Sequence, residues 1–334
     1  MSGNAELANL IRLMSRQANA AVTKEEVHSV AAMAKAYDGE FRYDNKPMYW
    51  LSVTGVMTFA LLYYWFNQRY YSLGVNQYIY LSLCVLIAVV PLLLVFSRRN
   101  AISSLSTTLF RKDCLLDNQI EKIEAKGALC NRLLKGFIEF DRGNYSNSIA
   151  ELYRTTSLSD RQYHFYRYHY IDREVRTRIV SDGKGGTKTV TETVYHHYDR
   201  YGLVFEINLA RGLAVISSGH VPRAVRYRPA SIAFTKMFSI GALTEHDAAK
   251  LVPPTLQLAL LEVGNRFKGF NIDINADGLL CMSFNEDVLA ASPKTDLTEP
   301  EKYFDELTGT TKLPLLKELL AFYDTLVDEW TDKF

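Results

Sequence analysis

The chain has 334 residues, of which 38 are basic and 37 acidic, so its net charge at pH 7 is +1. A chain so evenly balanced has no overall field that would attract nucleic acid, and we expect no nucleic-acid partner. Its four cysteines are widely spaced and include no C-x-x-C pair, which argues against a disulfide framework and against a zinc site.

The first 47 residues form a polar segment that carries two apolar stripes at helical spacing. Both stripes fall within residues 4–36, and Thr23 with Glu26 three positions later is typical of a helix start. We therefore predict an N-terminal cytoplasmic helical segment over 1–47, built from two short amphipathic helices. Three placements are open for these helices: docked on the main α+β domain, along a membrane, or on a partner.

Residues 48–97 carry two long apolar runs. The 22 residues between Lys46 and Arg69 and the 28 residues between Arg69 and Arg98 contain no Asp, Glu, Lys, Arg or His. Each run is long enough to cross a hydrocarbon core of roughly 30 Å, and segments that cross lipid must be helical. The sequence predicts a transmembrane hairpin with helices at about 48–66 and 77–97. Because ion pathways need ionisable side chains within the membrane, an anchor in the lipid bilayer is favoured over a transporter.

Basic residues lie mainly on one side of this predicted hairpin. Only Arg69 falls in the short loop between the spans, whereas six basic residues precede the first span and four follow soon after the second. Lysine and arginine cross membranes poorly, so both termini are expected to be cytoplasmic. The predicted location is a plasma membrane crossed twice.

The chain beyond the hairpin is expected to form a connecting helix and one domain. The sequence predicts a basic connecting helix over residues 98–140, because an apolar stripe from Leu105 to Phe137 keeps helical spacing. A cytoplasmic α+β domain is predicted over residues 141–334, because strand-like and helix-like segments are intermingled there without the regular alternation of a parallel sheet. We expect an antiparallel sheet, a long β-hairpin and packed helices.

The long β-hairpin is the clearest element of this domain. From Arg161 onward, aromatic and β-branched residues alternate with polar ones, a glycine-rich turn follows near Gly183 to Gly186, and the alternation then resumes. Further strands are predicted at 213–217 and 224–227. A second hairpin is predicted within 270–284.

Three helices are predicted in the second half of the domain. One begins at Thr244, where Asp247 lies three residues on, and a second covers about 255–267 and is ended by Gly269. The last begins at Pro314 and carries an amphipathic pattern.

Two patterns resemble metal sites, and neither is favoured. Asp273, Asn275, Asp277 and Gly278 have the spacing of the first half of a calcium-binding loop, but Phe284 stands where a bidentate glutamate is needed, so a plain turn is favoured.

Four histidines lie in the long hairpin: His164, His169, His196 and His197. With a turn centred between Lys184 and Gly185, His196 would lie opposite Arg173 and His197 opposite Asp172. Neighbours along a strand point to opposite faces, so no three of these histidines are expected to converge. We expect neither a metal site nor a cofactor.

The aromatic residues of the long hairpin form the candidate interaction face. Its members are Tyr163, Tyr166, Tyr168, Tyr170, Arg173, Tyr195, His197 and Tyr198. Tyrosine and arginine are enriched in protein interfaces. Aromatic pairing across the sheet, and stacking on single-stranded nucleic acid, are the alternatives for the same residues.

The order of these features resembles a bacterial family known as domain of unknown function 3137. The resemblance lies in the hairpin VRTRIVSDGKGGTKTVTETVYHHYDRYGLVFEINL, in FTKMFSI from Phe234, and in the run from Ala248 to Phe284, and it covers about residues 150–290. It implies a membrane hairpin with a cytoplasmic α+β domain and a place in the bacterial inner membrane. It implies no catalytic residues. Relatives often lie near genes for LemA-type membrane proteins, which makes such a protein one candidate partner.

The sequence thus favours a membrane-anchored, non-enzymatic module that binds a protein partner or assembles as a homo-oligomer. The alternative is a membrane-bound enzyme with an unrecognised active site in the α+β domain, using Asp172 and Glu174 or the nearby histidines.

Overall fold

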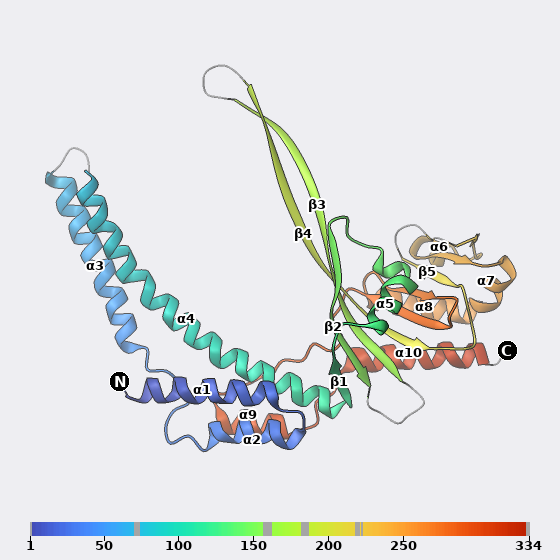
Figure 1. The fold of residues 1–334 in the computed structure, drawn as a ribbon, viewed down its shortest axis with the longest axis horizontal. Helices are drawn as coiled ribbons and strands as arrows, with labels where there is room; N and C mark the ends of the chain where they lie inside the picture. The colour runs from blue at the N-terminus through green and yellow to red at the C-terminus, as the bar shows by residue number, and fades with distance from the viewer. Residues whose placement is uncertain are drawn as a thin grey trace. The chain divides into compact units, whose positions relative to one another are not determined.

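The computed structural model describes residues 2–69, 74–155, 162–181, 187–217, 221 and 223–331. These residues form two compact units (Figure 1). The first comprises residues 1–117 and 291–312, and the second comprises residues 118–290 and 313–334. A stretch from the last third of the chain therefore belongs with the N-terminal unit, whereas the sequence placed all of 141–334 in one domain.

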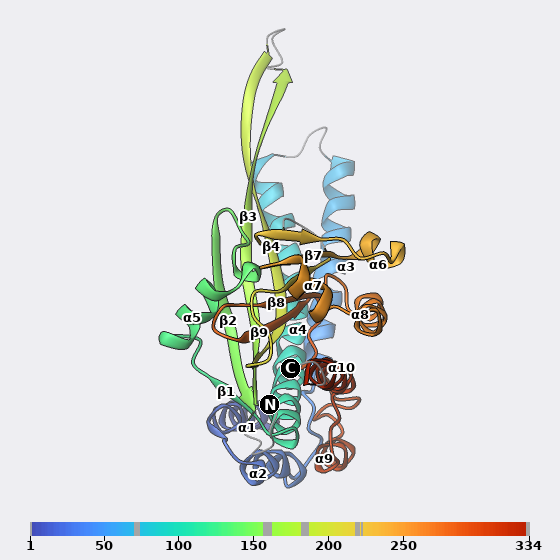
Figure 2. The same ribbon diagram turned by 90° about the vertical axis from the view of Figure 1, so that its right-hand side faces the viewer.

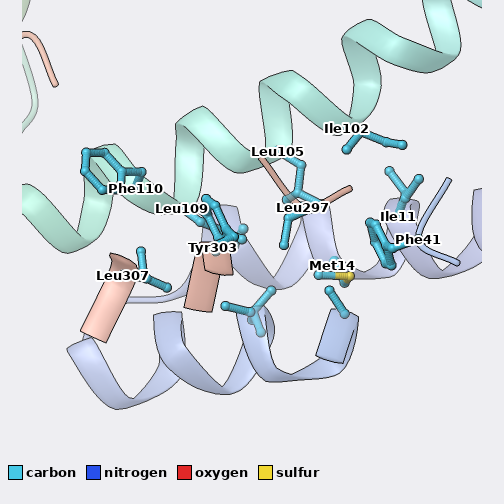
Figure 3. Packing of buried hydrophobic residues seen from close by; sticks show 14 of the residues in the cluster. Ile11, Met14, Phe41, Ile102, Leu105, Leu109, Phe110, Leu297, Tyr303 and Leu307 are labelled. Atoms are coloured by element: carbon cyan, nitrogen blue, oxygen red, sulfur yellow. The ribbon is translucent and has the colours of Figure 1, made fainter. Parts of the chain in front are cut away.

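The first unit contains five helices among the described residues. They are α1 (Ser2–Ala20), α2 (Lys24–Lys35), α3 (Lys46–Arg69), α4 (Val75–Asp117) and α9 (Pro300–Thr308). The second half of α4 buries Leu105 and Leu109 against α1, α2 and α9 (Figure 3). Tyr303 of α9 lies fully inside this core, and its hydroxyl donates to the carbonyl oxygen of Ser106 at 2.7 Å.

The N-terminal helices pack against α4 and α9 within the first unit. Thr23 caps α2 with the predicted capping box, in which its hydroxyl accepts from the Glu26 N–H and the Glu26 carboxylate accepts from the Thr23 N–H. Lys24 bonds to Asp117, and His28 Nε2 lies 2.8 Å from Asp113 Oδ1. These polar contacts and the shared apolar core both hold α2 against the second half of α4.

Helix α4 is long and apolar enough to cross a membrane, and it is the one helix among the described residues that meets this test. It runs without interruption for 43 residues, so the second predicted span and the start of the predicted connecting helix are one helix. Helix α3 packs beside its first half, but the tyrosines and tryptophans at the ends of α3 make it less apolar. The structure therefore identifies one candidate span where the sequence predicted two.

The contact between α3 and α4 is close because small residues lie in it. A Cβ built on Gly55 would lie 2.8 Å from the backbone nitrogen of Ala88. The hydroxyl of Ser52 donates to the carbonyl oxygen of Ala88. On α4, Leu81, Cys84 and Ala88 are buried at helical spacing, whereas most of their apolar neighbours are exposed.

The predicted connecting helix over 98–140 is wrong beyond Asp117. There the chain forms strand β1 (Ile120–Ile123), helix α5 (Ala128–Gly136) and the short 3₁₀ helix η1 (Ile138–Phe140). Gln119 has φ of 55°, a left-handed conformation that ends the helix. The apolar stripe in the sequence could not reveal this break, because β1 forms by pairing with β2 (Ser146–Thr155), a strand more than twenty residues further along the chain.

The second unit is built on an antiparallel sheet of nine described strands, which confirms the α+β prediction. The strand order is β1-β2-β3-β4-β9-β8-β5-β7-β6. The remaining strands are β2 (Ser146–Thr155), β3 (Tyr163–Ser181), β4 (Thr187–Glu206), β5 (Ala214–Ile216), β6 (Val225–Tyr227), β7 (Ser239–Ala242), β8 (Asn271–Ile274) and β9 (Leu279–Phe284). The predicted long hairpin, both short strands and the second hairpin are present; Arg161 and the turn at 183–186 lie outside the described residues.

Helices cover both faces of this sheet (Figure 2). Helix α5 packs on one face over Tyr166 and Tyr168, and α10 (Pro314–Thr331) packs on the other, where Tyr323 stacks on Phe205 at 3.9 Å between ring centroids. The other helices are α6 (Ile232–Met237), α7 (Glu245–Leu251) and α8 (Pro254–Arg266). Thr244 caps α7 as predicted, whereas α8 ends at Arg266, three residues before Gly269.

Candidate functional site: the hairpin arm

Strands β3 and β4 extend beyond every other described strand of the sheet (Figure 1). On one side β2 pairs with β3 only as far as Ile171, and on the other β9 pairs with β4 only from Tyr201 onward. Residues 172–181 and 187–196 therefore pair only with each other among the described residues. We call this two-stranded ribbon the hairpin arm.

Three residues of the predicted interaction face lie in the core, so this part of the prediction is wrong. Tyr163, Tyr166 and Tyr168 are 6%, 0% and 0% exposed. Tyr168 donates to the carbonyl oxygens of Phe140 and Arg142 at 2.8 and 2.9 Å, and burial raises the pKa of Tyr163 and Tyr168 to about 12. Helices cover the base of β3, which a strand pattern alone does not reveal.

The exposed aromatic residues gather where the arm leaves the sheet. The ring of Tyr195 lies 4.9 Å from that of Tyr145, and the guanidinium of Arg173 lies 5.7 Å from the Tyr145 centroid. These three residues, which we call the Tyr145 cluster, are exposed; Tyr145 and Tyr195 have exposed fractions of 53% and 45%. The sequence named Arg173 and Tyr195 but missed Tyr145, which precedes β2 and gives no strand signal of its own.

Tyr170 and Tyr198 form a second aromatic pair on the other face of the arm's base. They are direct cross-strand partners, and their rings stack at 5.1 Å. Tyr198 is 44% exposed, while Tyr170 is half-buried. Adjacent positions on a strand point to opposite faces, so Tyr198 and the Tyr145 cluster cannot contact one flat surface together.

The histidines are paired differently from the prediction. His196 lies opposite Asp172 and His197 opposite Ile171, one residue away from the predicted register, because the register centres on position 184. The buried pairing of Phe165 with Leu203 belongs to this register, and a shift of either strand by one residue would move its buried side chain to the opposite face of the sheet.

His169 and His197 then share a face. His169 Nε2 lies 3.2 Å from His197 Nδ1, and His169 Nδ1 lies 2.9 Å from Asp199 Oδ1. Among the residues that the structure describes, no group of three or more His, Cys, Asp or Glu is placed to hold a metal ion.

The two carboxylates considered for an enzyme are engaged in the arm. Asp172 accepts from the Asn144 N–H at 3.1 Å, and Glu174 accepts from Arg176 at 2.8 Å and lies 3.0 Å from His196 Nε2. The hydrogen bonds from Arg176 and His196 lower the pKa of Glu174 to about 2. A carboxyl group held ionised in this way is poorly suited to be a general acid near neutral pH.

A buried charge cluster, which the sequence did not reveal, lies beneath the arm. Arg200 donates to Glu139 at 2.6 Å, and Ser283 and Asn271 also donate to this carboxylate. Burial opposes the ionisation of Glu139, but the charge and hydrogen bonds of Arg200, with help from Arg142 and Ser283, outweigh it and hold the pKa below its usual range. The cluster joins η1, β4, β8 and β9 around the Glu139 carboxylate, which pairs with both Arg200 and Arg142.

The segment that resembled a calcium-binding loop is the turn between β8 and β9, as predicted. Asp273 accepts from the Ile138 N–H and bonds to Arg223, while Asn275 accepts from the N–H groups of Asp277 and Leu279. Gly278 has φ of 78°, which suits the tight turn. The Asn275 oxygen thus closes the turn itself, while the Asp273 carboxylate joins β8 to η1 and to Arg223.

Comparison with known proteins adds no identification. No protein-family model, no curated protein and no solved structure matches this chain.

Proposed function

We propose that this chain is a membrane-anchored, non-enzymatic protein that binds a protein partner through its hairpin arm. The observation that carries the proposal is the arm itself, a paired ribbon with one exposed cluster of two tyrosines and an arginine at its base. Large aromatic and guanidinium groups that are already ordered lose little conformational freedom on binding, and such residues dominate protein interfaces.

The exposed surface of α3 and of the first half of α4 supports the membrane anchor. Most of the large apolar side chains that the described chain exposes lie between Tyr49 and Phe96. Soluble proteins rarely expose apolar patches of more than a few hundred Å², so a bilayer is the natural cover for this surface. The close approach at Gly55 allows α3 to cross beside α4, and we propose two spans.

The proposed orientation places both termini in the cytoplasm. Basic residues flank the two apolar segments at their outer ends, and Arg69 alone lies on the side of the connection. The resemblance to domain of unknown function 3137 supports the inner membrane of a bacterium. It also makes a LemA-type membrane protein one candidate partner.

The proposal is tested by capture of partners from native membranes. The full-length chain carrying an affinity tag is solubilised in mild detergent, and co-purifying proteins are identified by mass spectrometry for wild type and for Tyr145→Ala with Tyr195→Ala. We expect the double variant to lose its specific partners, because it removes both rings that contact each other at the base of the arm.

The matched control is Leu258→Ala, which truncates a large side chain of α8 that is 69% exposed outside the arm. This control should retain the same partners. Equal capture by the double variant, with its near-ultraviolet circular dichroism unchanged apart from the lost rings, would reject the Tyr145 cluster as the binding surface.

A further inference from the structure

The outer edge of β4 within the arm is unpaired among the described residues. On the opposite edge, Tyr145 N–H donates to Ile171 O at 3.1 Å, and Arg173 N–H donates to Asn144 Oδ1 at 2.7 Å. The backbone N–H and C=O groups of Ile171 and Arg173 therefore point away from β4. Their partners in β4 are His197 and Tyr195, so the backbone groups of these two residues point away from β3. It follows that the odd-numbered residues of β4 present their backbone N–H and C=O groups at its outer edge.

The side chains along this edge repeat symmetrically about Val190. The segment reads TKTVTET from Thr187 to Thr193, with threonine one and three positions away on both sides. Lys188 lies two positions before Val190 and Glu192 two positions after it. An antiparallel copy of this segment, centred on Val190, therefore places Lys188 of each copy opposite Glu192 of the other.

We propose that the arm binds the arm of a second copy of this chain by antiparallel pairing of the two β4 edges about Val190. The hydrogen-bonded pairs are then Thr189 with Thr191 and Thr187 with Thr193, whose backbone groups point outward, and the four strands form one continuous ribbon. The arrangement is a closed two-fold dimer, because each copy offers the same residues to the other.

Charge in this register alternates across the ribbon. Arg176 lies directly opposite Glu192 within one copy, and Glu192 lies opposite Lys188 of the second copy. Thr187, Thr189, Thr191 and Thr193 meet on the other face, which avoids like charges there. Sliding one strand by two residues would place Val190 opposite Glu192 or Lys188 and lose both Lys188–Glu192 pairs, and sliding it by four would bring Glu192 against Glu192 or Lys188 against Lys188, so charge favours the centred register.

This inference deepens the proposed function, since it names a second copy of the chain as one partner of the arm. It uses the edge of β4, whereas the Tyr145 cluster lies at the base of the arm on the side of β2. Anchoring in a shared membrane would raise the effective concentration of the two edges, so a small interface can suffice.

Cysteine cross-linking tests the register in the full-length chain reconstituted in liposomes. In the proposed pairing, Val190 faces its own copy across a non-hydrogen-bonded pair with Cα atoms about 4.5 Å apart, within the range of roughly 4.4–6.8 Å that a disulfide spans. We expect Val190→Cys to form a disulfide-linked dimer on mild oxidation. The four native cysteines are buried and give a low background.

The matched control is Val194→Cys, which lies on the same strand and the same face and is equally half-buried. Its partner in the proposed register is position 186 of the second copy, so it should cross-link far less. Equal cross-linking at both positions, or none at position 190, would overturn the proposal.

Charge reversal provides an independent test by the oligomeric state in the same liposomes, measured by energy transfer between labelled copies. Lys188→Glu and Glu192→Lys should each weaken dimerisation by about tenfold or more, because each creates two like-charge pairs. The double reversal should restore wild-type dimerisation. Additive losses in the double variant, or a wild-type chain that stays monomeric, would contradict the pairing.

These outcomes are separate from the test of the proposed function. The variants at positions 188, 190 and 192 leave the Tyr145 cluster intact. A monomeric chain that still captures other proteins through Tyr145 and Tyr195 would reject the edge pairing alone, and loss of capture with dimerisation intact would reject the cluster alone.

Discussion

Single residues of the hairpin differ widely in what surrounds them, although they share one sequence pattern. Tyr166 and Tyr198 both lie in the tyrosine-rich stretches of the hairpin, yet Tyr166 is 0% exposed and Tyr198 is 44% exposed. The hydroxyl of Tyr166 lies 3.3 Å from Cys281 Sγ, and burial raises its pKa well above the usual value. The first residue therefore contributes to stability and the second remains available at the surface.

Tyr166 gives a direct measure of this difference. We expect Tyr166→Ala to lower the free energy of unfolding by roughly 3–5 kcal/mol, because it leaves a cavity the size of a ring. Tyr166→Phe, which loses only the contact with a weak thiol, should cost about 1 kcal/mol. Urea unfolding followed by near-ultraviolet circular dichroism measures both, and Tyr198→Ala is the exposed control. Similar losses at positions 166 and 198 would contradict the burial.

Glu139 should make unfolding stability depend on pH. Its folded-state pKa lies below the ordinary value of 4.5, so its contribution is fully present above about pH 4.5 and is lost as pH falls through the folded pKa. Glu139→Gln leaves Arg200 buried without this counter-charge and should cost roughly 3–5 kcal/mol at pH 7. The difference in unfolding free energy between wild type and variant should shrink between pH 5 and pH 3. A difference that is constant over this range would count against the ion pair.

At the scale of elements, helix α4 has two environments along one continuous helix. Its first half exposes large apolar side chains except where α3 packs on Leu81, Cys84 and Ala88, and its second half buries Leu105 and Leu109 under α1, α2 and α9. The basic residues Arg98 and Arg99 lie between the two halves. One helix can therefore carry the chain from an apolar medium into a water-soluble bundle.

The packing of α3 on α4 depends on Gly55. Gly55→Leu places a side chain where Ala88 backbone already lies, so we expect the helices to separate and Cys84 to become accessible. Reaction of Cys84 with a small membrane-permeant maleimide, followed by peptide mass spectrometry, should increase several-fold. Val56→Leu, at a position 57% exposed on the same helix, should leave the reaction unchanged. Equal reaction rates of Cys84 in both variants would show that the contact at Gly55 does not hold α3 and α4 together.

At the scale of the whole molecule, the first unit is assembled from the N-terminal third of the chain and a stretch from its last third, residues 291–312. Leu297 and Tyr303 lie in the same core as Ile11 and Met14, although nearly three hundred residues separate them (Figure 3). The Leu297 N–H donates to Ser106 Oγ at 3.0 Å, which fixes the returning segment on α4. The chain thus leaves this unit for the sheet, returns for residues 291–312, and ends in the second unit.

The proposed topology can be mapped with single cysteines and a membrane-impermeant maleimide. In intact cells we expect Gly74→Cys to react, while Val22→Cys and Leu258→Cys react only after the membrane is opened, because Gly74 lies between α3 and α4 and the other two lie outside this pair. All three positions reacting from one side would reject the two proposed spans. The reverse pattern would reject the proposed orientation.

Several features followed from the sequence because they depend on neighbours within a few residues. The helix starts at Thr23 and Thr244, the strands of the long hairpin and the turn after Asp273 are local patterns of side chains and backbone preference. Apolar runs likewise indicate candidate membrane segments, since their length and composition need no partner. Length and composition were sufficient to identify α4 as a candidate membrane span, whereas α3, with tyrosines and tryptophans at its ends, does not meet the same criterion.

The sequence by itself determined an α+β protein with a long apolar helix and a tyrosine-rich hairpin. Only the tertiary structure decided which tyrosines are buried, that Tyr145 joins Arg173 and Tyr195, that the register centres on position 184, and that Glu139 pairs with Arg200. The physical reason is that a strand pattern fixes which residues share a face, while burial and pairing depend on elements far away in the chain. The arm stands clear of other strands because β2 and β9 end beside its base.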